Sequence, residues 1–461
     1  MGNARRPGLW GGDSSVPGEV DAPIGAVGLT TDAWAEPALG RVGGLVGRVA
    51  RRRIVMLTAG AIAAQGVALL AAPFLARIYS PADFGAYGVA MAAIGVAASL
   101  ATMRYSTAIA LPVDDRDAAV LTLVSIAASV GVAVATGVAL YAALPLIAPT
   151  IPEARPVVAF CAAISVFALG MYQVTSALAT RRADVTTISL SRFTQSGSIV
   201  FSQLALGLLG SPLGLIVGDA LGRIVGLFGT VRVWRQWLPR MGGFHYSLGP
   251  TVRYKNFPLA AGPAALLNVL TLQVPTLAVV ALYGASSGGQ FLLVQRVAGV
   301  PLAVIAVSVA QDFLVTVIER GEARADGLRR QTEVAERRLL LIGAPFVVLA
   351  AVLAPIAFPV VFGPDWTQAG VIFSISSPLY LVQLASSPLG AVYDVLERQD
   401  LVAIRETIRL GLIATAVGLC VLTRPSLEAG VALLTAASVA GYIVYHALAS
   451  RALSDSERQK A

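Results

Sequence analysis

Three arginines lie well inside long apolar segments of the sequence: Arg192, Arg223 and Arg296. A charged side chain at the centre of a bilayer costs at least about 2.5 to 3.5 kcal/mol, so such a residue normally faces a water-filled cavity, a partner or a substrate. The three arginines therefore predict an anionic ligand or a polar passage inside a membrane.

Arg192 belongs to a polar stripe on a predicted helix over residues 183–208. Residues at spacings of three, four and seven share one face of this helix and are polar: Ser189, Arg192, Gln195, Ser196, Ser202 and Gln203. Such a face is unsuited to lipid. The stripe predicts either the wall of a cavity that binds a polar solute or a packed network, because serine and glutamine also bridge membrane helices.

Arg223 and Arg296 differ in their neighbours. Asp219 lies four residues before Arg223, so the two side chains can form a structural ion pair or, alternatively, a proton- or cation-coupled switch. Arg296 follows Gln295 and has no carboxylate within one helical turn. Its partner is therefore expected on another helix or on a ligand.

The composition is that of a polytopic membrane protein. Hydrophobic residues make up 56% of the 461 residues, charged residues 13%, and the mean hydropathy is +0.75, which is too apolar for a soluble protein of this length. The formal net charge of +8 does not indicate nucleic acid, since the distribution of the charges matters more than their sum. Cys161 and Cys420 both lie in apolar segments and predict no disulfide.

Sequence signatures of hydrolytic and metal chemistry are few. The only lysines are Lys255 and Lys460, neither in a phosphate-binding loop, and the only histidines are His245 and His446. The string Asp115-Arg116-Asp117 matches a short pattern that holds a metal and a sugar nucleotide in some enzymes, but no nucleotide-binding domain accompanies it. We expect no ATP hydrolysis, no metal and no cofactor.

Twelve apolar stretches follow residue 53, each long enough to cross a hydrocarbon core of about 30 Å. They cover residues 54–76, 84–103, 118–149, 156–180, 183–208, 213–232, 258–283, 288–317, 339–362, 366–393, 402–423 and 428–449. Alternate loops are rich in arginine, whereas the others carry only Arg77, Arg155 and Arg424. This asymmetry predicts a multi-pass membrane protein with both termini in the cytoplasm.

A weak internal repeat divides the twelve stretches. Ile78-Tyr79 followed by Gly85-Ala86-Tyr87 recurs 204 residues later as Leu282-Tyr283 followed by Gly289-Gln290-Phe291. The repeat predicts two six-helix lobes, an arrangement of transporters that bind their substrate between the halves. The expected organisation is a disordered cytoplasmic tail at 1–50, an N-terminal lobe at 51–235, a connecting cytoplasmic loop at 236–257, a C-terminal lobe at 258–449 and a cytoplasmic tail at 450–461.

Five strings occur in a fixed order along the chain: LARIYSPADFGAYG (75–88), RYSTAIALPVDD (104–115), SRFTQS (191–196), YKNFPL (254–259) with Leu267-Asn268, and QRVAGVPL (295–302). Together they resemble the Wzx-type polysaccharide flippases of the multidrug/oligosaccharidyl-lipid/polysaccharide (MOP) exporter superfamily. The resemblance implies an all-α, MATE-like fold of about twelve transmembrane helices in two lobes around a central cavity.

The resemblance also implies a substrate and a site. Such flippases move a polyprenyl-pyrophosphate-linked oligosaccharide to the outer leaflet by alternating access, and arginines in their cationic lumen are thought to meet the pyrophosphate. A guanidinium stays charged and offers several donors to phosphate oxygens. The implied substrate-binding residues are Arg296, Arg192, Arg104 and, less directly, Arg223, with Gln295, Gln195 and Asn268 for the sugar.

The expected substrate serves exopolysaccharide, capsule or O-antigen synthesis. Expected partners are membrane lipids, a polysaccharide polymerase and export machinery, and a proton or sodium gradient is the candidate energy source. Three alternatives stay open, one of which is a non-transporting scaffold in an export complex. A cation-coupled multidrug exporter of the same superfamily would favour acidic lumen residues, and a membrane-embedded polysaccharide polymerase or ligase would need a large external loop.

Overall fold

The computed structural model describes residues 60, 62–147, 154–182, 184–241, 248–319, 325–396 and 398–458. These residues are almost entirely helical, and no strand occurs among them. The all-α class predicted from the sequence is confirmed. The predicted tail at 1–50 lies outside the described residues.

The first part of the chain forms helices joined by short turns. They are Ile62–Ile78, α2 (Pro81–Leu100), α3 (Tyr105–Ala108), α4 (Asp115–Ile147), α5 (Arg155–Arg181), α6 (Val185–Leu208), α7 (Gly214–Leu227) and α8 (Val231–Met241), the last two joined by the 3-10 turn Phe228–Thr230. Ser80 shows how such a helix begins: its hydroxyl accepts from the Asp83 amide, while the Asp83 carboxylate accepts from the Ser80 amide.

The second part begins with α9 (Gly249–Arg253) and the π-turn Phe257–Ala261. It continues with α10 (Gly262–Glu319), α11 (Ala325–Phe362), the 3-10 turn Pro364–Trp366, α12 (Thr367–Ala385), α13 (Leu389–Val395), α14 (Gln399–Thr423) and α15 (Leu427–Arg458). Two helices run beyond their predicted spans. α11 begins before residue 339 and α15 continues past 449, because polar residues with good helix propensity extend each helix beyond its apolar section.

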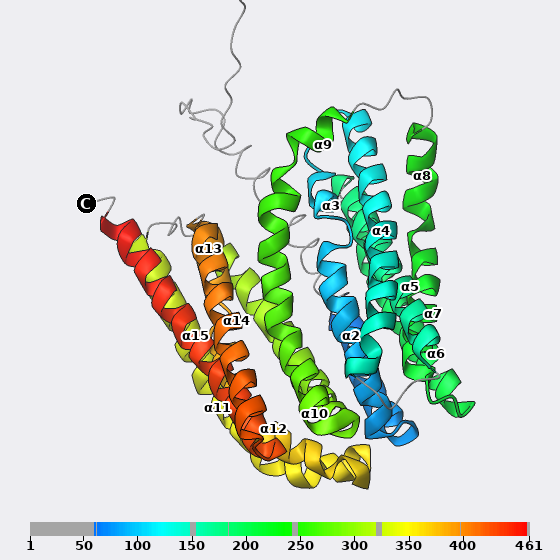
Figure 1. The fold of residues 1–461 in the computed structure, drawn as a ribbon. Coiled ribbons are helices and arrows are strands. Elements are labelled where there is room, and N and C mark those ends of the chain that lie inside the picture. The colour runs from blue at the N-terminus through cyan, green and yellow to red at the C-terminus, as the bar shows by residue number, and fades with distance from the viewer. Residues whose placement is uncertain are drawn as a thin grey trace, which may run out of the picture. The chain divides into compact units, whose positions relative to one another are not determined.

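The packing joins the two parts along α2 and α10. α10 contacts α2 over much of its length and also contacts α12 and α14. In Figure 1, helices α4 to α8 gather on one side of this pair and α11 to α15 on the other.

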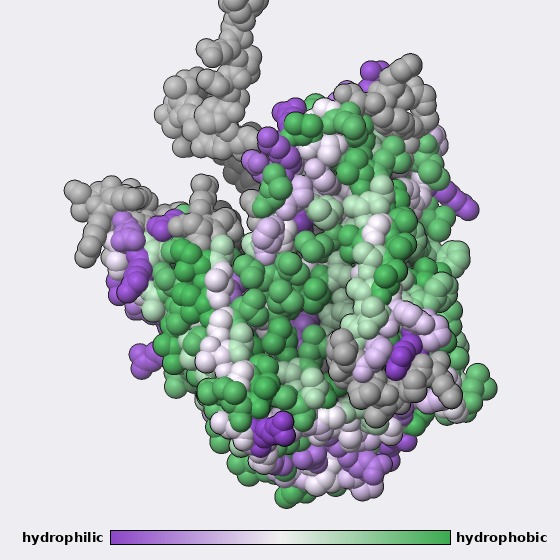
Figure 2. All heavy atoms as spheres, in the orientation of Figure 1, coloured by the Kyte–Doolittle hydropathy of each residue, from purple (hydrophilic) through white to green (hydrophobic). Residues whose placement is uncertain are grey.

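Nine helices among the described residues are long and apolar enough to cross a membrane. Figure 2 shows hydrophobic side chains over most of the middle of the visible face and hydrophilic ones mainly toward its ends. α11 is the clearest case of a face turned to lipid, since Phe346 and Val352 are 69% and 68% exposed. The protein is a multi-pass membrane protein.

The difference between nine spans and the twelve predicted has three sources. The helix Ile62–Ile78 is described over only part of its predicted span, and α6 carries the polar stripe that lowers its hydropathy. The predicted seventh and eighth helices run on as α10, although Gly284 at φ 89° and ψ 169° is not helical. This positive φ favours glycine and marks the turn between the two. The count of twelve stays a prediction.

The internal repeat corresponds to a crossing of two helix starts. A Cβ atom at Gly85 would lie 1.9 Å from the Ala285 carbonyl oxygen, and one at Gly289 would lie 1.8 Å from the Pro81 carbonyl oxygen. Pro81 and Ala285, like Gly85 and Gly289, are 204 residues apart, which is the spacing of the sequence repeat. The two contacts are therefore related by the repeat, and each needs a glycine for the backbones to approach.

The repeated tyrosines also occupy matching places. Each tyrosine hydroxyl packs against a glycine. A Cβ atom at Gly214 would lie 2.0 Å from the Tyr79 hydroxyl, and one at Gly430 would lie 2.1 Å from the Tyr283 hydroxyl. Burial of the phenol and, to a smaller extent, the negative charge of Asp83 raise the pKa of Tyr79 to about 12. The hydroxyl therefore stays protonated, and it donates a hydrogen bond of 2.7 Å to the Gln203 carbonyl oxygen.

We expect a Gly85→Ala substitution to destabilise the protein by about 1–3 kcal/mol or more, because a methyl group cannot avoid a backbone carbonyl by changing rotamer. Thermal unfolding of the purified protein in detergent measures the effect. The matched control is Gly131→Ala on α4, where no atom lies within 4 Å of the added Cβ and alanine favours the helix. Equal melting temperatures for the two variants would contradict the close crossing.

Candidate functional site

Two of the predicted arginines meet in a cavity of about 420 Å³. Arg104 enters it from the start of α3 and Arg192 from α6, while α5 supplies the wall between them. The lining residues are Arg104, Ser106, Thr107, Ala110, Tyr172, Gln173, Ser176, Ala177, Thr180 and Arg192. None of them is acidic, so the cavity carries two formal positive charges that no lining carboxylate offsets.

The backbone places the Arg104 side chain in a particular way. Arg104 has φ 61° and ψ 1°, in the left-handed region that non-glycine residues adopt at a cost of about 1–2 kcal/mol. The Thr107 hydroxyl supports this turn by donating a hydrogen bond of 2.6 Å to the Arg104 carbonyl oxygen. The Arg104 Nε atom is buried and has no hydrogen-bond partner, and a buried donor without a partner is costly.

Arg192 lies at the other side of the cavity and is exposed. Its Nε donates to the Tyr172 hydroxyl over 3.0 Å, which orients the guanidinium along the cavity wall. An anion in this cavity would therefore meet two guanidinium groups together with the Ser176 hydroxyl, which is buried without a hydrogen-bond partner, and such donors suit phosphate oxygens.

Arg223 is bound differently. Its Nε and Nη2 atoms lie 2.6 Å and 2.9 Å from the two carboxylate oxygens of Asp219. Tyr87 and Ser165 donate further hydrogen bonds to the same carboxylate over 3.3 Å and 3.0 Å, and the pair is buried. This is the geometry of a buried structural ion pair, and the alternative role as an ion-coupled switch stays a prediction.

Arg296 lies near this ion pair. Its side chain on α10 is half-buried, and within the described residues it has no hydrogen bond or ion pair. α10 packs along α2, the helix whose Tyr87 hydroxyl donates to Asp219. Gln295 accepts a hydrogen bond of 2.9 Å from the Thr276 hydroxyl and lines a separate cavity of about 230 Å³.

The other two predicted contacts are not brought into the arginine cavity. Gln195 packs against Gly226, where a Cβ would lie 2.7 Å from the Gln195 Cα, and its Nε2 atom is buried without a partner. Asn268 is exposed on α10. Their roles toward a sugar stay predictions.

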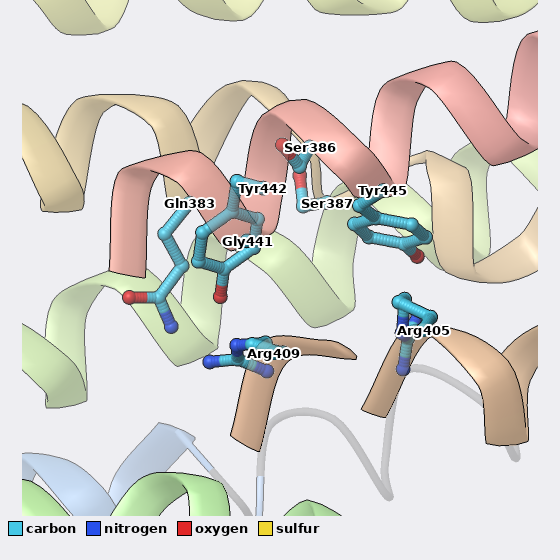
Figure 3. Close-up of a pocket in the computed structure, with 8 residues that line it drawn as sticks. All are labelled: Gln383, Ser386, Ser387, Arg405, Arg409, Gly441, Tyr442 and Tyr445. Carbon is cyan, nitrogen blue, oxygen red and sulfur yellow. The ribbon is translucent and has the colours of Figure 1, made fainter. Parts of the chain in front are cut away.

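A second arginine-lined cavity, of about 200 Å³, lies between α12, α14 and α15 (Figure 3). The Arg405 guanidinium stacks on the Tyr445 ring at 4.3 Å and the Arg409 guanidinium on the Tyr442 ring at 4.9 Å. Glu406 lies between the two arginines. It accepts hydrogen bonds from Arg405 and faces Arg409 Nη1 at 3.6 Å.

Sequence reasoning missed this cavity. Arg405 and Arg409 lie one helical turn apart on the predicted helix over residues 402–423. The spacing of four residues was a signal that both face one way, as was the pair Tyr442 and Tyr445 on α15. Nothing in the sequence indicated that these two helices pack together.

The first aspartate of the Asp115-Arg116-Asp117 string forms an ion pair with Arg181. Arg181 Nη2 lies 2.9 Å from an Asp115 carboxylate oxygen, and the same guanidinium donates to the Pro112 and Val113 carbonyl oxygens. Within the described part of the chain, no group of three or more His, Cys, Asp or Glu residues is placed to hold a metal ion.

The fold is that of transporters of the MOP superfamily. The chain is similar to an inward-facing multidrug resistance MATE family transporter, with a TM-score of 0.69 at 16% identity over 88% of this chain and 96% of that one. It is also similar to the lipid II flippase MurJ in an inward closed conformation, with a TM-score of 0.68 at 12% identity over 85% of this chain and 86% of that one.

Residues 74–370 match the polysaccharide biosynthesis protein family, and the chain belongs to this family. A curated relative is the succinoglycan biosynthesis transport protein ExoT of Rhizobium meliloti (strain 1021), which is 25% identical over 312 residues. The match covers 66% of this chain and 60% of the length of that relative. The membrane-protein class and the MOP fold predicted from the sequence are confirmed.

Proposed function

We propose that this protein is a flippase that moves a polyprenyl-pyrophosphate-linked oligosaccharide across the cytoplasmic membrane for the synthesis of an exopolysaccharide, a capsule or an O-antigen. Its family, its similarity to a succinoglycan transport protein and its likeness in fold to a lipid II flippase support this proposal. Translocation breaks no covalent bond, so no catalytic residue is required.

The cavity of Arg104 and Arg192 carries the proposal. The two guanidinium groups match the two negative charges of a pyrophosphate diester, and no acidic residue lines the cavity to offset them. The Arg104 Nε is a buried donor without a partner and could bind one of the pyrophosphate oxygens. The Ser176 hydroxyl at the same wall is buried and has no hydrogen-bond partner, so it adds a donor, whereas the hydroxyls of Thr107 and Thr180 already donate to backbone carbonyl oxygens. The cavity lies at the ends of α2 and α5 that are predicted to face the cytoplasm, where lipid-linked sugars are assembled.

The same cavity disfavours a cation exporter. A lumen with two unpaired positive charges repels cationic drugs, because like charges at close range cost free energy. We propose that Arg296, which has no ion-pair partner among the described residues, provides a second contact for the pyrophosphate as the substrate moves, with a proton or sodium gradient as the energy source.

Deletion of the gene tests the function directly. We expect a polyprenyl-linked glycan to accumulate on the cytoplasmic face of the membrane, and the intact gene to clear it. Unchanged glycan together with increased drug sensitivity would favour the multidrug alternative. Complementation with Arg296→Ala tests that residue separately, since full clearance by this variant would remove Arg296 from the mechanism.

A further inference from the structure

The second arginine cavity differs from the first in its charge. Arg405 and Arg409 carry two positive charges, and buried Glu406, which faces both, carries one negative charge. Ser386 on the opposite wall lies 3.2 Å from His446 Nε2, and His446 Nδ1 faces Glu336 at 3.5 Å. Glu336 does not line this cavity, and within the described part of the chain no ion pair joins it to Arg405 or Arg409. The arginine cluster has one net positive charge, whereas the Arg104–Arg192 cavity has two.

Arg409 keeps one edge of its guanidinium free. Nη1 faces Glu406, but Nε is buried and has no hydrogen-bond partner. The Nε side of a guanidinium is one of the edges on which arginine binds a carboxylate through two parallel hydrogen bonds. In Figure 3, the Arg409 guanidinium, the Gln383 amide and the Tyr442 hydroxyl face the same space.

The chain makes room for this arrangement at Gly441. A Cβ atom there would lie 2.8 Å from the Arg409 Cγ, so only glycine lets the Arg409 side chain lie across α15 at this position. The neighbouring cavity of about 230 Å³ shares both Gln383 and Arg409 and is lined by further polar groups, among them Thr271, Gln295 and Ser438. A polar track therefore continues from Arg409 toward Gln295.

We propose that the Arg405–Arg409 cavity binds a carboxylate carried by a sugar of the transported glycan. This inference rests on the proposed function and adds to it a substrate class, an acidic oligosaccharide. One net positive charge matches the single charge of a carboxylate, while the buried Glu406 disfavours a doubly charged pyrophosphate. The amide of Gln383 and the hydroxyls of Ser387 and Tyr442 are placed for the hydroxyls of the same sugar.

Binding to the purified full-length protein in detergent tests the proposal, with methyl glucuronide, methyl glucoside, acetate and inorganic pyrophosphate as probes. We expect the glucuronide to bind at least about tenfold more tightly than the glucoside or acetate, since a hydrogen bond to a charged group contributes about 1.5–3 kcal/mol. Arg409→Gln should remove this advantage and leave pyrophosphate binding intact. Glu406 stays paired with Arg405 in this variant, which favours correct folding.

A second variant avoids any change of charge. Gly441→Ala should displace Arg409 and weaken glucuronide binding, whereas Gly418→Ala on α14, where no atom lies within 4 Å of the added Cβ, should not. Glucuronide binding that survives both Arg409→Gln and Gly441→Ala, or acetate binding as tight as that of the glucuronide, would overturn the proposal. If Arg409→Gln instead loses pyrophosphate binding and keeps glucuronide binding, the result counts against the pyrophosphate site of the proposed function.

Discussion

An Asp219→Asn substitution is expected to lower the stability of the protein by about 3–5 kcal/mol, because it leaves the buried Arg223 guanidinium without its counter-charge. The asparagine keeps the size of the aspartate, but its single amide oxygen can accept from only one of Tyr87 and Ser165, which donate to different oxygens of the carboxylate, so the variant removes the charge and one acceptor. Thermal unfolding in detergent and the amount of folded protein recovered from the membrane measure this effect.

A double variant separates stability from function. Replacing both members of a buried ion pair is often close to neutral, so Asp219→Asn with Arg223→Met should recover most of the stability. If the pair is structural, this variant also clears the lipid-linked glycan in the deletion strain. A double variant that folds but does not transport would assign the pair to coupling.

An exposed ion pair provides the control for this experiment. Arg329 and Glu333 on α11 are 3.2 Å apart and their side chains are 47% and 66% exposed. Glu333→Gln should therefore change stability by less than about 1 kcal/mol. If it destabilises the protein as much as Asp219→Asn does, the effect is not specific to the buried charge.

Sequence patterns predicted the helices well because apolar stretches of membrane length leave few alternatives. They predicted the Asp219–Arg223 pair for a similar reason, since residues four apart on a helix are neighbours in any helix. The count of spans was harder to predict because it depends on backbone geometry at Gly284 and on a polar helix, α6.

Contacts between helices that are distant in the sequence were much harder to predict. The resemblance selected both Arg104 and Arg192, but their meeting in one cavity depends on the left-handed turn at Arg104 and on the way α5 lies between α3 and α6. The Arg405–Arg409 cavity depends on α14 packing against α15, with Gly441 admitting one side chain. A single sequence contains no signal for such a contact. The repeat around Tyr79 and Tyr283 predicted two related halves, but the close crossing at Gly85 and Gly289 is known only from the structure.

Replacing both arginines of the first cavity tests the proposed mechanism most severely. Arg104→Gln combined with Arg192→Gln removes two charge-assisted contacts to the pyrophosphate, each of about 1.5–3 kcal/mol, so substrate affinity should fall by roughly 10² to 10⁴-fold. Folding should be preserved, because Arg104 Nε has no hydrogen-bond partner and Arg192 Nε bonds only to Tyr172. The measurement is the rate of flipping of a fluorescent polyprenyl-pyrophosphate glycan in proteoliposomes.

The control must remove the same charge from the same predicted side of the membrane without touching the cavity. Arg232→Gln combined with Arg235→Gln does so, since both side chains are exposed and neither lines the cavity. If the control loses as much flipping as the cavity variant, general electrostatic attraction to the anionic substrate explains the effect. If the cavity variant flips at the wild-type rate, the pyrophosphate does not pass through this site. Loss in the cavity variant alone would place the pyrophosphate between Arg104 and Arg192, because only there does the substitution remove donors that the anion itself must use.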